Sequence, residues 1–313
     1  MTPLRLALAA ALLAASAAPR EVPNDRLRVR GADGAWRTWW TRGAAPSRWA
    51  GPDAALAAAV RWRAARPGLD WGELVLAADV GAALPALRVR VIVARVDPSR
   101  VALALHAAAR PSGGAGPWDL DAAPADAALA LNAGQFTDAG PWGWVVHRGR
   151  EIQAPGAGPL SAALVIDDRG RARVVPADSI AELRASGSAA EAVQSYPALL
   201  DGDGTLPAAL RAPGRGVDLA HRDARLAACE LRDGRLLVAL TRFDAGVGDA
   251  LGGVPLGLTV PETAALVGAL GCRRAVMLDG GLSAQLLVRD AEGRTHRWEG
   301  LRRVPLGLVG ASR

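Results

Sequence analysis

One carboxylate in this chain stands at the end of an apolar run and directly before two glycines. Residues 274–278 have the pattern of a buried strand, and Asp279 follows them in front of Gly280 and Gly281. The glycines leave room beside the carboxylate and let the backbone approach a ligand closely or take a positive φ. Strand ends with such turns are common places for binding sites. The alternative is an ordinary tight turn with a solvated aspartate.

Three other segments carry polar side chains beside strand-like runs or in turns. Asn132 follows the run 127–131 and offers both a donor and an acceptor. Arg225 stands at the entrance of the run 226–231, where a guanidinium suits a phosphate or a carboxylate. Each segment also has a plainer reading as a turn, a loop or an exposed arginine. The candidate ligand-binding residues of these segments and of the Asp279 turn are Gly134, Phe136, Gln194, Ser195, His221, Arg222, Gly280, Gly281 and Ser283.

Most of the elements that we expect to position these residues are strands. Alternating or apolar runs predict strands at residues 87–96, 101–106, 127–131, 144–147, 162–166, 172–175, 226–231 and 236–241. The Asp97-Pro98-Ser99 turn predicts a β-hairpin between the first two runs. Short Asp-Gly or Arg-Gly turns separate the last two pairs.

Helices are fewer. One is expected over residues 52–65 with Asp53 as its cap, and one over residues 179–184. The clearest covers residues 260–270, where Thr259 and Glu262 have the spacing of a capping box. The pattern therefore predicts an α+β fold, a β-rich mixed sheet with flanking helices in a single main domain.

The first residues have the pattern of a secretory signal peptide. Arg5 precedes the apolar run 6–15, and Ala15-Ser16-Ala17 is an A-x-A-like cleavage site. That run is too short to span a membrane, and no other stretch approaches the required length. We therefore expect residues 1–17 to be a signal peptide on an exported, periplasmic or secreted protein. Residues 18–66 form a Trp-rich segment, whose indoles either pack on the neighbouring domain or stack on sugars, and residues 67–313 form the main domain.

Charge and cysteine content narrow the function classes. The 37 basic residues are all arginine and the formal net charge is +6, but basic residues are interspersed with acidic ones. Nucleic acid is therefore not an expected partner. Cys229 and Cys272 form either one disulfide, as suits an oxidising compartment, or two buried thiols. The four histidines are scattered and suggest no zinc site.

The order of these segments resembles the phosphodiester glycosidase family. Asn132-Ala133-Gly134-Gln135-Phe136 is similar to the family's Asn-Gly-Gly-Phe-Phe element, and Arg225-Leu226-Ala227-Ala228 to its Arg-Thr-Ala strand. The stretch 257–283, which ends in Asp279-Gly280-Gly281-Leu282-Ser283, resembles its most distinctive part, and residues 303–308 its closing strand. The resemblance covers residues 67–309.

The resemblance implies cleavage between the anomeric carbon of a sugar and a phosphate oxygen, in a cell-wall or exopolysaccharide substrate. Because a phosphate monoester leaves more readily than a sugar alkoxide, a cation could replace the usual acid carboxylate. Asp279 would then be the base or stabilising carboxylate, Arg225 would neutralise the phosphate, and Asn132 would orient the substrate. No cofactor is assigned, although a divalent cation could bridge Asp279 and phosphate.

Two other functions remain open at this point. Ala133, Gln135, Leu282 and Ala284 differ from the family pattern, which keeps a non-catalytic polysaccharide-binding protein as an alternative. A metal-dependent phosphodiesterase that cuts the phosphorus–oxygen bond is less favoured, because such sites gather several His and Asp ligands.

Overall fold

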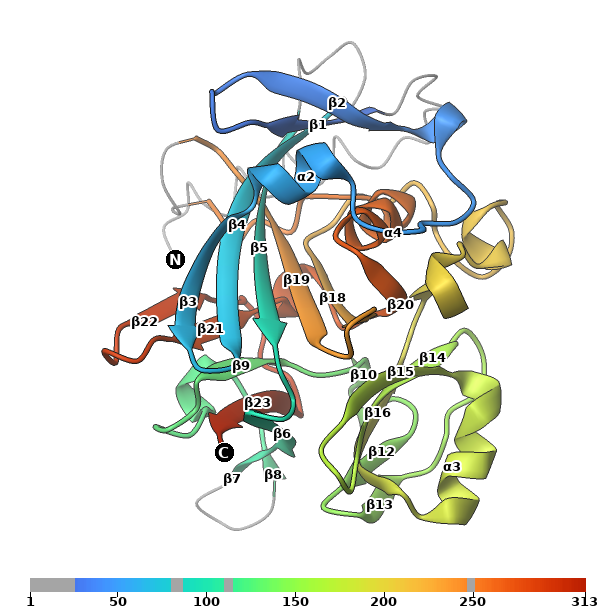
Figure 1. Ribbon diagram of the computed structural model, residues 1–313. Helices are drawn as coiled ribbons and strands as arrows, with labels where there is room; N and C mark the ends of the chain where they lie inside the picture. The colour runs from blue at the N-terminus through green and yellow to red at the C-terminus, as the bar shows by residue number, and fades with distance from the viewer. Residues whose placement is uncertain (1–25, 80–86, 110–114, 247–250) are drawn as a thin grey trace.

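The protein is built mainly from antiparallel strands. The computed structural model describes residues 26–79, 87–109, 115–246 and 251–313, so the expected signal peptide lies outside the described residues. Within them, three larger sheets, two two-stranded ribbons and three α-helices make up the fold (Figure 1). The α+β class is confirmed. The sheets are not mixed, because every strand pairing within the described residues is antiparallel.

The largest sheet has nine strands in the order β17-β20-β18-β19-β5-β4-β1-β2, with β3 also paired to β4. Its strands are β1 (Arg26–Arg30), β2 (Trp36–Thr41), β3 (Arg61–Arg66), β4 (Leu69–Ala78), β5 (Leu87–Val96), β17 (Ala198–Leu200), β18 (Arg225–Leu231), β19 (Leu236–Phe243) and β20 (Cys272–Met277). Strands β1, β2 and β3 come from the Trp-rich segment, so the described part of that segment is built into the main sheet.

Two five-stranded sheets complete the framework. The second sheet, β22-β21-β9-β23-β6, contains β6 (Val101–His106), β9 (Leu129–Asn132), β21 (Leu286–Arg289), β22 (Thr295–Trp298) and β23 (Gly307–Ser312). The third, β13-β12-β16-β14-β15, contains β12 (Val145–His147), β13 (Arg150–Gln153), β14 (Ala162–Asp167), β15 (Ala172–Pro176) and β16 (Ala189–Ser195). The ribbons are β7 (Ala108–Ala109) with β8 (Ala115–Gly116), and β10 (Phe136–Thr137) with β11 (Gly140–Pro141).

The nine-stranded sheet is covered on both faces. One face shares a buried core with the second and third sheets, in which Ile92 and Leu240 join Leu131 and Leu164. The other face packs against α2 (Ala54–Ala59) and α4 (Val260–Ala269), as Figure 1 shows. The remaining helix, α3 (Ile180–Ser186), lies on the third sheet. The three sheets therefore meet around one core.

The helix predictions were confirmed except in length. Thr259 and Glu262 make the capping box of α4, and Asp53 caps α2 through the N–H of Leu56. The helix predicted over residues 52–65 is wrong beyond Ala59, because Val60 is extended and β3 begins at Arg61. Pairing with β4 outweighs the helical preference of this alanine-rich stretch.

The hairpin predicted between residues 87–96 and 101–106 is also wrong. Both strands exist with the predicted bounds, but β5 pairs with β4 and β19 whereas β6 pairs with β23. The turn at residues 97–99 therefore carries the chain from one sheet into another. Alternation identifies a strand and its buried face but does not identify its partner.

The cysteines and the Trp-rich segment both tie elements together. Cys229 in β18 and Cys272 in β20 form a disulfide across neighbouring strands, with 5.8 Å between their Cα atoms. In the Trp-rich segment, the Trp49 indole fills the space beside Gly268 of α4, where a Cβ would lie 2.3 Å from Cδ1 of the ring. This indole therefore packs on the main domain.

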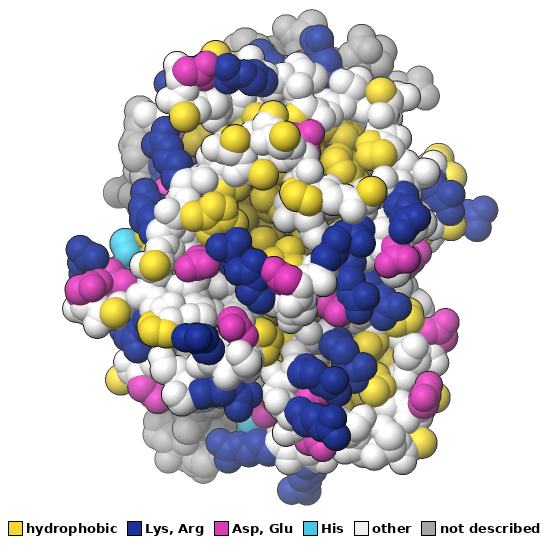
Figure 2. All heavy atoms as spheres, in the orientation of Figure 1, with side chains coloured by type: hydrophobic (Ala, Val, Ile, Leu, Met, Phe, Trp, Pro, Cys, Tyr) yellow, Lys and Arg dark blue, Asp and Glu magenta, His cyan; other side chains and the backbone are white. Residues whose placement is uncertain are grey.

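Charged side chains of both signs are interspersed over the face shown in Figure 2. Most described acidic residues have an arginine partner, as in the Arg95–Asp70 and Arg235–Asp233 ion pairs. No helix in the described part of the chain is long and apolar enough to cross a membrane.

Candidate active site

The ends of strands from all three sheets meet at Asp279. Residues after β20 are held by the second sheet, because the Asn132 amide donates to the Asp279 carbonyl at 2.7 Å and its oxygen accepts the Gln285 N–H at 3.0 Å. The third sheet holds the same strand through Ser195, whose hydroxyl donates to the Met277 carbonyl at 2.6 Å. Asn132 and Ser195 are both fully buried. Their side chains therefore shape the loop that presents Asp279.

The two glycines are required by close packing against the start of β18. A Cβ on Gly280 would lie 2.6 Å from the Ala224 carbonyl oxygen, nearer than real Cβ contacts come. Gly281 has a φ of +59° and donates its N–H to the same carbonyl at 2.8 Å. A Cβ there would lie 3.0 Å from Oδ2 of Asp223. The glycines therefore bring the Asp279 loop into contact with residues 223–225.

The carboxyl group of Asp279 is largely buried, and its Oδ2 atom has no hydrogen-bond partner within the described residues. Burial raises the pKa of Asp279 to about 6. The negative charge of Asp223 acts in the same direction, whereas a hydrogen bond with Ser283 and the positive charge of Arg302 lower the pKa. A buried carboxylate with one unpartnered oxygen and a pKa near neutrality is typical of a catalytic acid or base.

This carboxylate should make the protein less stable at neutral pH. The folded state holds the Asp279 proton up to about pH 6, whereas the unfolded state loses it near 3.8. The stronger proton binding of the folded state therefore stabilises it fully at low pH. This stabilisation is lost as the pH rises from about 4 to 6. Because two pKa units correspond to about 3 kcal/mol, we expect Asp279→Asn to raise the unfolding free energy by up to that amount at pH 7.

Urea unfolding at pH 4 and pH 7 measures this effect, and the gain should vanish at pH 4. Asp218 provides a control, because its pKa is lowered whereas that of Asp279 is raised. The N–H of Ala220 is the largest of the influences that lower the pKa of Asp218. Asp218→Asn should therefore bring no gain at pH 7. An Asp279→Asn protein with unchanged or reduced stability at pH 7 would contradict the burial of this charge.

The two arginines predicted at β18 are held by protein groups. Arg225 is buried, with Nε donating to the Leu258 carbonyl at 3.0 Å and Nη2 to the His221 carbonyl at 2.6 Å. Burial lowers the pKa of its guanidinium, and the nearby carboxylates oppose this effect, Asp223 most strongly. Arg222 forms a two-bond ion pair with the buried Glu262, at 2.6 and 2.7 Å. Arg225 thus lies at the candidate site, whereas Arg222 secures the capping box of α4.

Sequence reasoning missed one arginine beside Asp279. Arg302 is exposed, lies 4.7 Å above the ring of Phe136 in a cation–π contact, and acts electrostatically on Asp279. It makes no ion pair within the described residues, in contrast to Arg303, which pairs with Asp119 at 2.7 Å. Arg302 directly precedes residues 303–308, which resemble the family's closing strand, but nothing in the sequence distinguished it from the other arginines.

The remaining predicted residues divide into two groups. Three of them lie beside a charged group of the site. His221 Nε2 is 3.6 Å from Asp223 Oδ2, Ser283 forms a hydrogen bond with Asp279, and the Phe136 ring lies under Arg302. Gln194 is buried, and its amide oxygen is already occupied by the N–H groups of Trp144 and Gly156 at 2.9 and 3.0 Å.

Gly134 serves close packing. A Cβ at this position would lie 2.4 Å from Cγ2 of Val193, a residue of the third sheet. Gly134 therefore allows the segment after β9 to pack closely on the third sheet, whereas the Gln194 side chain bonds within the region of the third sheet.

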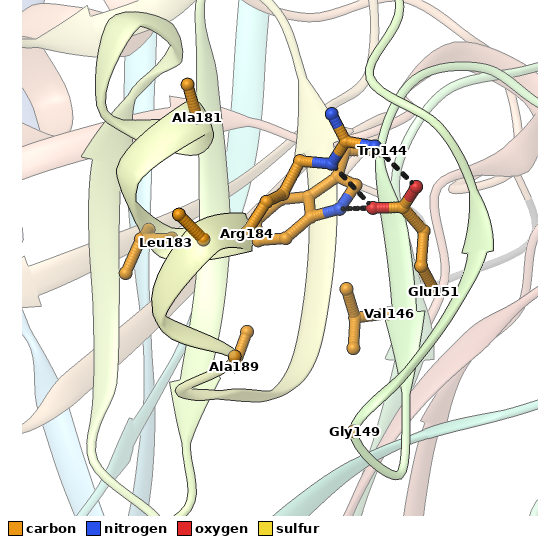
Figure 3. A pocket seen from close by; sticks show the side chains of 10 residues that line it. Trp144, Val146, Gly149, Glu151, Ala181, Leu183, Arg184 and Ala189 are labelled. Carbon is orange, nitrogen blue, oxygen red and sulfur yellow. Dashed lines mark hydrogen bonds and ion pairs between the residues drawn. The ribbon is translucent and has the colours of Figure 1, made fainter.

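A cavity of about 470 Å³ lies elsewhere, between α3 and the β12–β13 hairpin (Figure 3). Glu151 pairs there with Arg184 through two contacts of 2.7 and 2.8 Å and accepts the indole N–H of Trp144. These groups satisfy one another, and none of the predicted site residues lines the cavity. Within the described residues, no cluster of three or more His, Cys, Asp or Glu side chains could hold a metal ion.

Comparison with known proteins agrees with this arrangement. The sequence model of the phosphodiester glycosidase family matches residues 125–309, which include Asn132, Arg225, Asp279 and Arg302. The chain belongs to this family. Membership, together with the fold, supports a glycosidase-type function for the protein. No curated protein sequence matches the chain.

Solved structures share the fold at low sequence identity. The catalytic domain of zebrafish N-acetylglucosamine-1-phosphodiester alpha-N-acetylglucosaminidase, auto-inhibited by its pro-peptide, is 17% identical, with a TM-score of 0.60 over 82% of this chain and 89% of that one. A hypothetical protein from Synechocystis is 16% identical, with a TM-score of 0.59 over 92% and 68%. A putative exported protein from Burkholderia pseudomallei is 18% identical, with a TM-score of 0.50 over 99% and 89%.

Proposed function

We propose that this family member is an exported hydrolase that cleaves a sugar-1-phosphodiester in a cell-wall or exopolysaccharide substrate. The bond broken joins the anomeric carbon to a phosphate oxygen. The observation that carries the proposal is the Asp279 carboxylate, whose buried Oδ2 has no hydrogen-bond partner in the described part of the chain, together with the exposed Arg302, whose positive charge acts on it. The two groups offer one negative charge for the sugar and one positive charge for the phosphate.

Asp279 acts at the anomeric carbon. Cleavage of a glycosidic bond passes through a transition state with positive charge on the sugar, which an adjacent carboxylate stabilises. With a pKa of about 6, Asp279 is ionised in most molecules at neutral pH and still has enough proton affinity to accept a proton from the attacking water. The water oxygen forms the new bond to the anomeric carbon.

Arg302 takes the role that the sequence had suggested for Arg225. The departing group is a phosphate monoester, whose negative charge a guanidinium can bind through two hydrogen bonds. The electron pair of the broken bond stays on the phosphate oxygen, so no strong acid is needed to protonate it. Arg225, held by two backbone carbonyls, keeps β18 and its neighbouring loop in place and adds positive charge nearby.

Export is supported by two features of the chain. Residues 1–17 have the charged, apolar and small-residue regions of a signal peptide. The Cys229–Cys272 disulfide fits an oxidising compartment, where such bonds persist.

Sugar release from three matched substrates tests the proposal. A sugar-1-phosphodiester should be hydrolysed, whereas the corresponding plain glycoside and a phosphodiester without an anomeric linkage should be much poorer substrates. A panel of sugar-1-phosphodiesters that bind without hydrolysis, together with measurable binding of an anionic polysaccharide, would instead identify a non-catalytic binding protein.

A further inference from the structure

A second carboxylate lies in the site beside Asp279. Asp223 stands just before β18, and its side chain is only 20% exposed. Its N–H and the Leu258 carbonyl join it to the segment that leads into α4. Its Oδ2 lies against Gly281, two residues after Asp279. The packing that makes glycine necessary at position 281 therefore also sets the Asp223 carboxylate against the Asp279 loop.

The Asp223 carboxylate has polar and positively charged groups around it. Its Oδ1 accepts the N–H of Ala224 at 2.9 Å, and its Oδ2 lies 3.6 Å from Nε2 of His221, whose side chain is 48% exposed. Burial raises the pKa of Asp223, whereas Arg225 and His221 act against this rise. Like charges held close together in a partly buried site make each carboxylate harder to ionise.

We propose that Asp223 is a positioning residue for hydrolysis, a charge partner that strengthens Asp279 as the acceptor of the water proton. This inference rests on the proposed function. In the step it serves, water gives its oxygen to the anomeric carbon and its proton to Asp279, while the carbon–oxygen bond to phosphate breaks. Asp223 contacts neither the sugar nor the phosphate in this scheme.

Several charged groups act on this pair from the elements packed around it. Ser283 acts on Asp279 from the loop after β20, and Arg302 acts on it from the segment between β22 and β23. His221 and Arg225 act on Asp223 from either side of it in the chain. Around Arg225, the further charged or titratable groups are Asp218, Glu262 and Tyr196. Asp223 is the carboxylate whose negative charge opposes ionisation of Asp279, so its removal has a predictable sign.

The test is Asp223→Asn, with Asp218→Asn as the matched control. Loss of the Asp223 charge should move the acidic limb of the kcat/KM profile to lower pH by at least half a unit and lower kcat at pH 7. Asp223→Glu, which keeps the charge, should recover much of both effects. Asp218→Asn should leave the profile unchanged, because Asp218 acts on Arg225 and not directly on Asp279.

A second readout does not depend on activity. The pH range over which Asp279→Asn changes the unfolding free energy reports the proton affinity of Asp279 itself. That range should lie at lower pH when Asp279→Asn is introduced into the Asp223→Asn protein than when it is introduced into the unsubstituted protein. If the range and the kcat/KM profile both stay where they are in the unsubstituted protein, the inference is wrong. If the range shifts but no sugar-1-phosphodiester is hydrolysed, the charge coupling stands and the proposed function fails.

Discussion

Asp279→Asn should lower kcat for a sugar-1-phosphodiester by about 10²- to 10⁴-fold, the range lost when a positioned acid or base is removed. The amide of asparagine has nearly the same shape as the carboxylate but can neither accept the water proton nor stabilise positive charge on the sugar. Initial rates over a range of substrate concentrations measure the effect, and kcat should fall much more than KM changes.

The same variant provides its own evidence that the fold is intact, since it should be more stable at pH 7. Asp290→Asn is the matched control, because Asp290 is also a buried aspartate just after a strand. Its carboxylate is already paired with Arg294 at 2.7 Å, and neither residue is among the groups that act on Asp279. Asp290→Asn should keep kcat and lose stability. Full activity in a folded Asp279→Asn protein would remove Asp279 from the mechanism.

Arg302→Ala should reduce kcat/KM for the phosphodiester by about 10- to 100-fold, since a hydrogen bond to a charged group contributes about 1.5–3 kcal/mol. Any residual hydrolysis of a plain glycoside should change little, because that substrate has no phosphate for Arg302 to bind. Parallel kcat/KM measurements on the two substrates separate loss of phosphate binding from general damage.

Arg303→Ala is the control for Arg302→Ala, because the neighbouring arginine is also exposed to solvent but pairs with Asp119. It should leave kcat/KM for both substrates nearly unchanged. Arg225→Ala should differ from both, since removing a buried cation from two carbonyl partners chiefly lowers stability. Equal losses on phosphodiester and glycoside in Arg302→Ala would refute the phosphate role.

Local sequence pattern predicted the place of Asp279 but could not separate chemistry from scaffolding around it. An apolar run followed by Asp-Gly-Gly predicts a strand end, and β20 ends at Met277, two residues before Asp279. Asn132 was predicted at a strand end and Ser195 in a turn, yet both bond to backbone carbonyls, Asn132 to that of Asp279 and Ser195 to that of Met277 at the end of β20. Which partner a polar side chain finds depends on sheet packing, which pattern alone does not reveal.

Sequence analysis missed Arg302 and Asp223 for the same reason. Arg302 is one of 37 arginines. Its place above Phe136, without an ion pair to any other described residue, arises only in the folded chain. Asp223 was part of the segment around Arg225, but its approach to Gly281 depends on how two strand ends pack. The β5–β6 hairpin was mispredicted for a related reason, because alternation does not reveal which strands become neighbours.

The bond that is cleaved is the central claim, and hydrolysis in water enriched in oxygen-18 tests it most directly. Attack at the anomeric carbon places the label on the sugar and leaves the released phosphate monoester unlabelled. Mass spectrometry of both products should therefore find oxygen-18 on the sugar alone. Label on the phosphate would show that the phosphorus–oxygen bond is cut, and would contradict the roles proposed for Asp279 and Arg302.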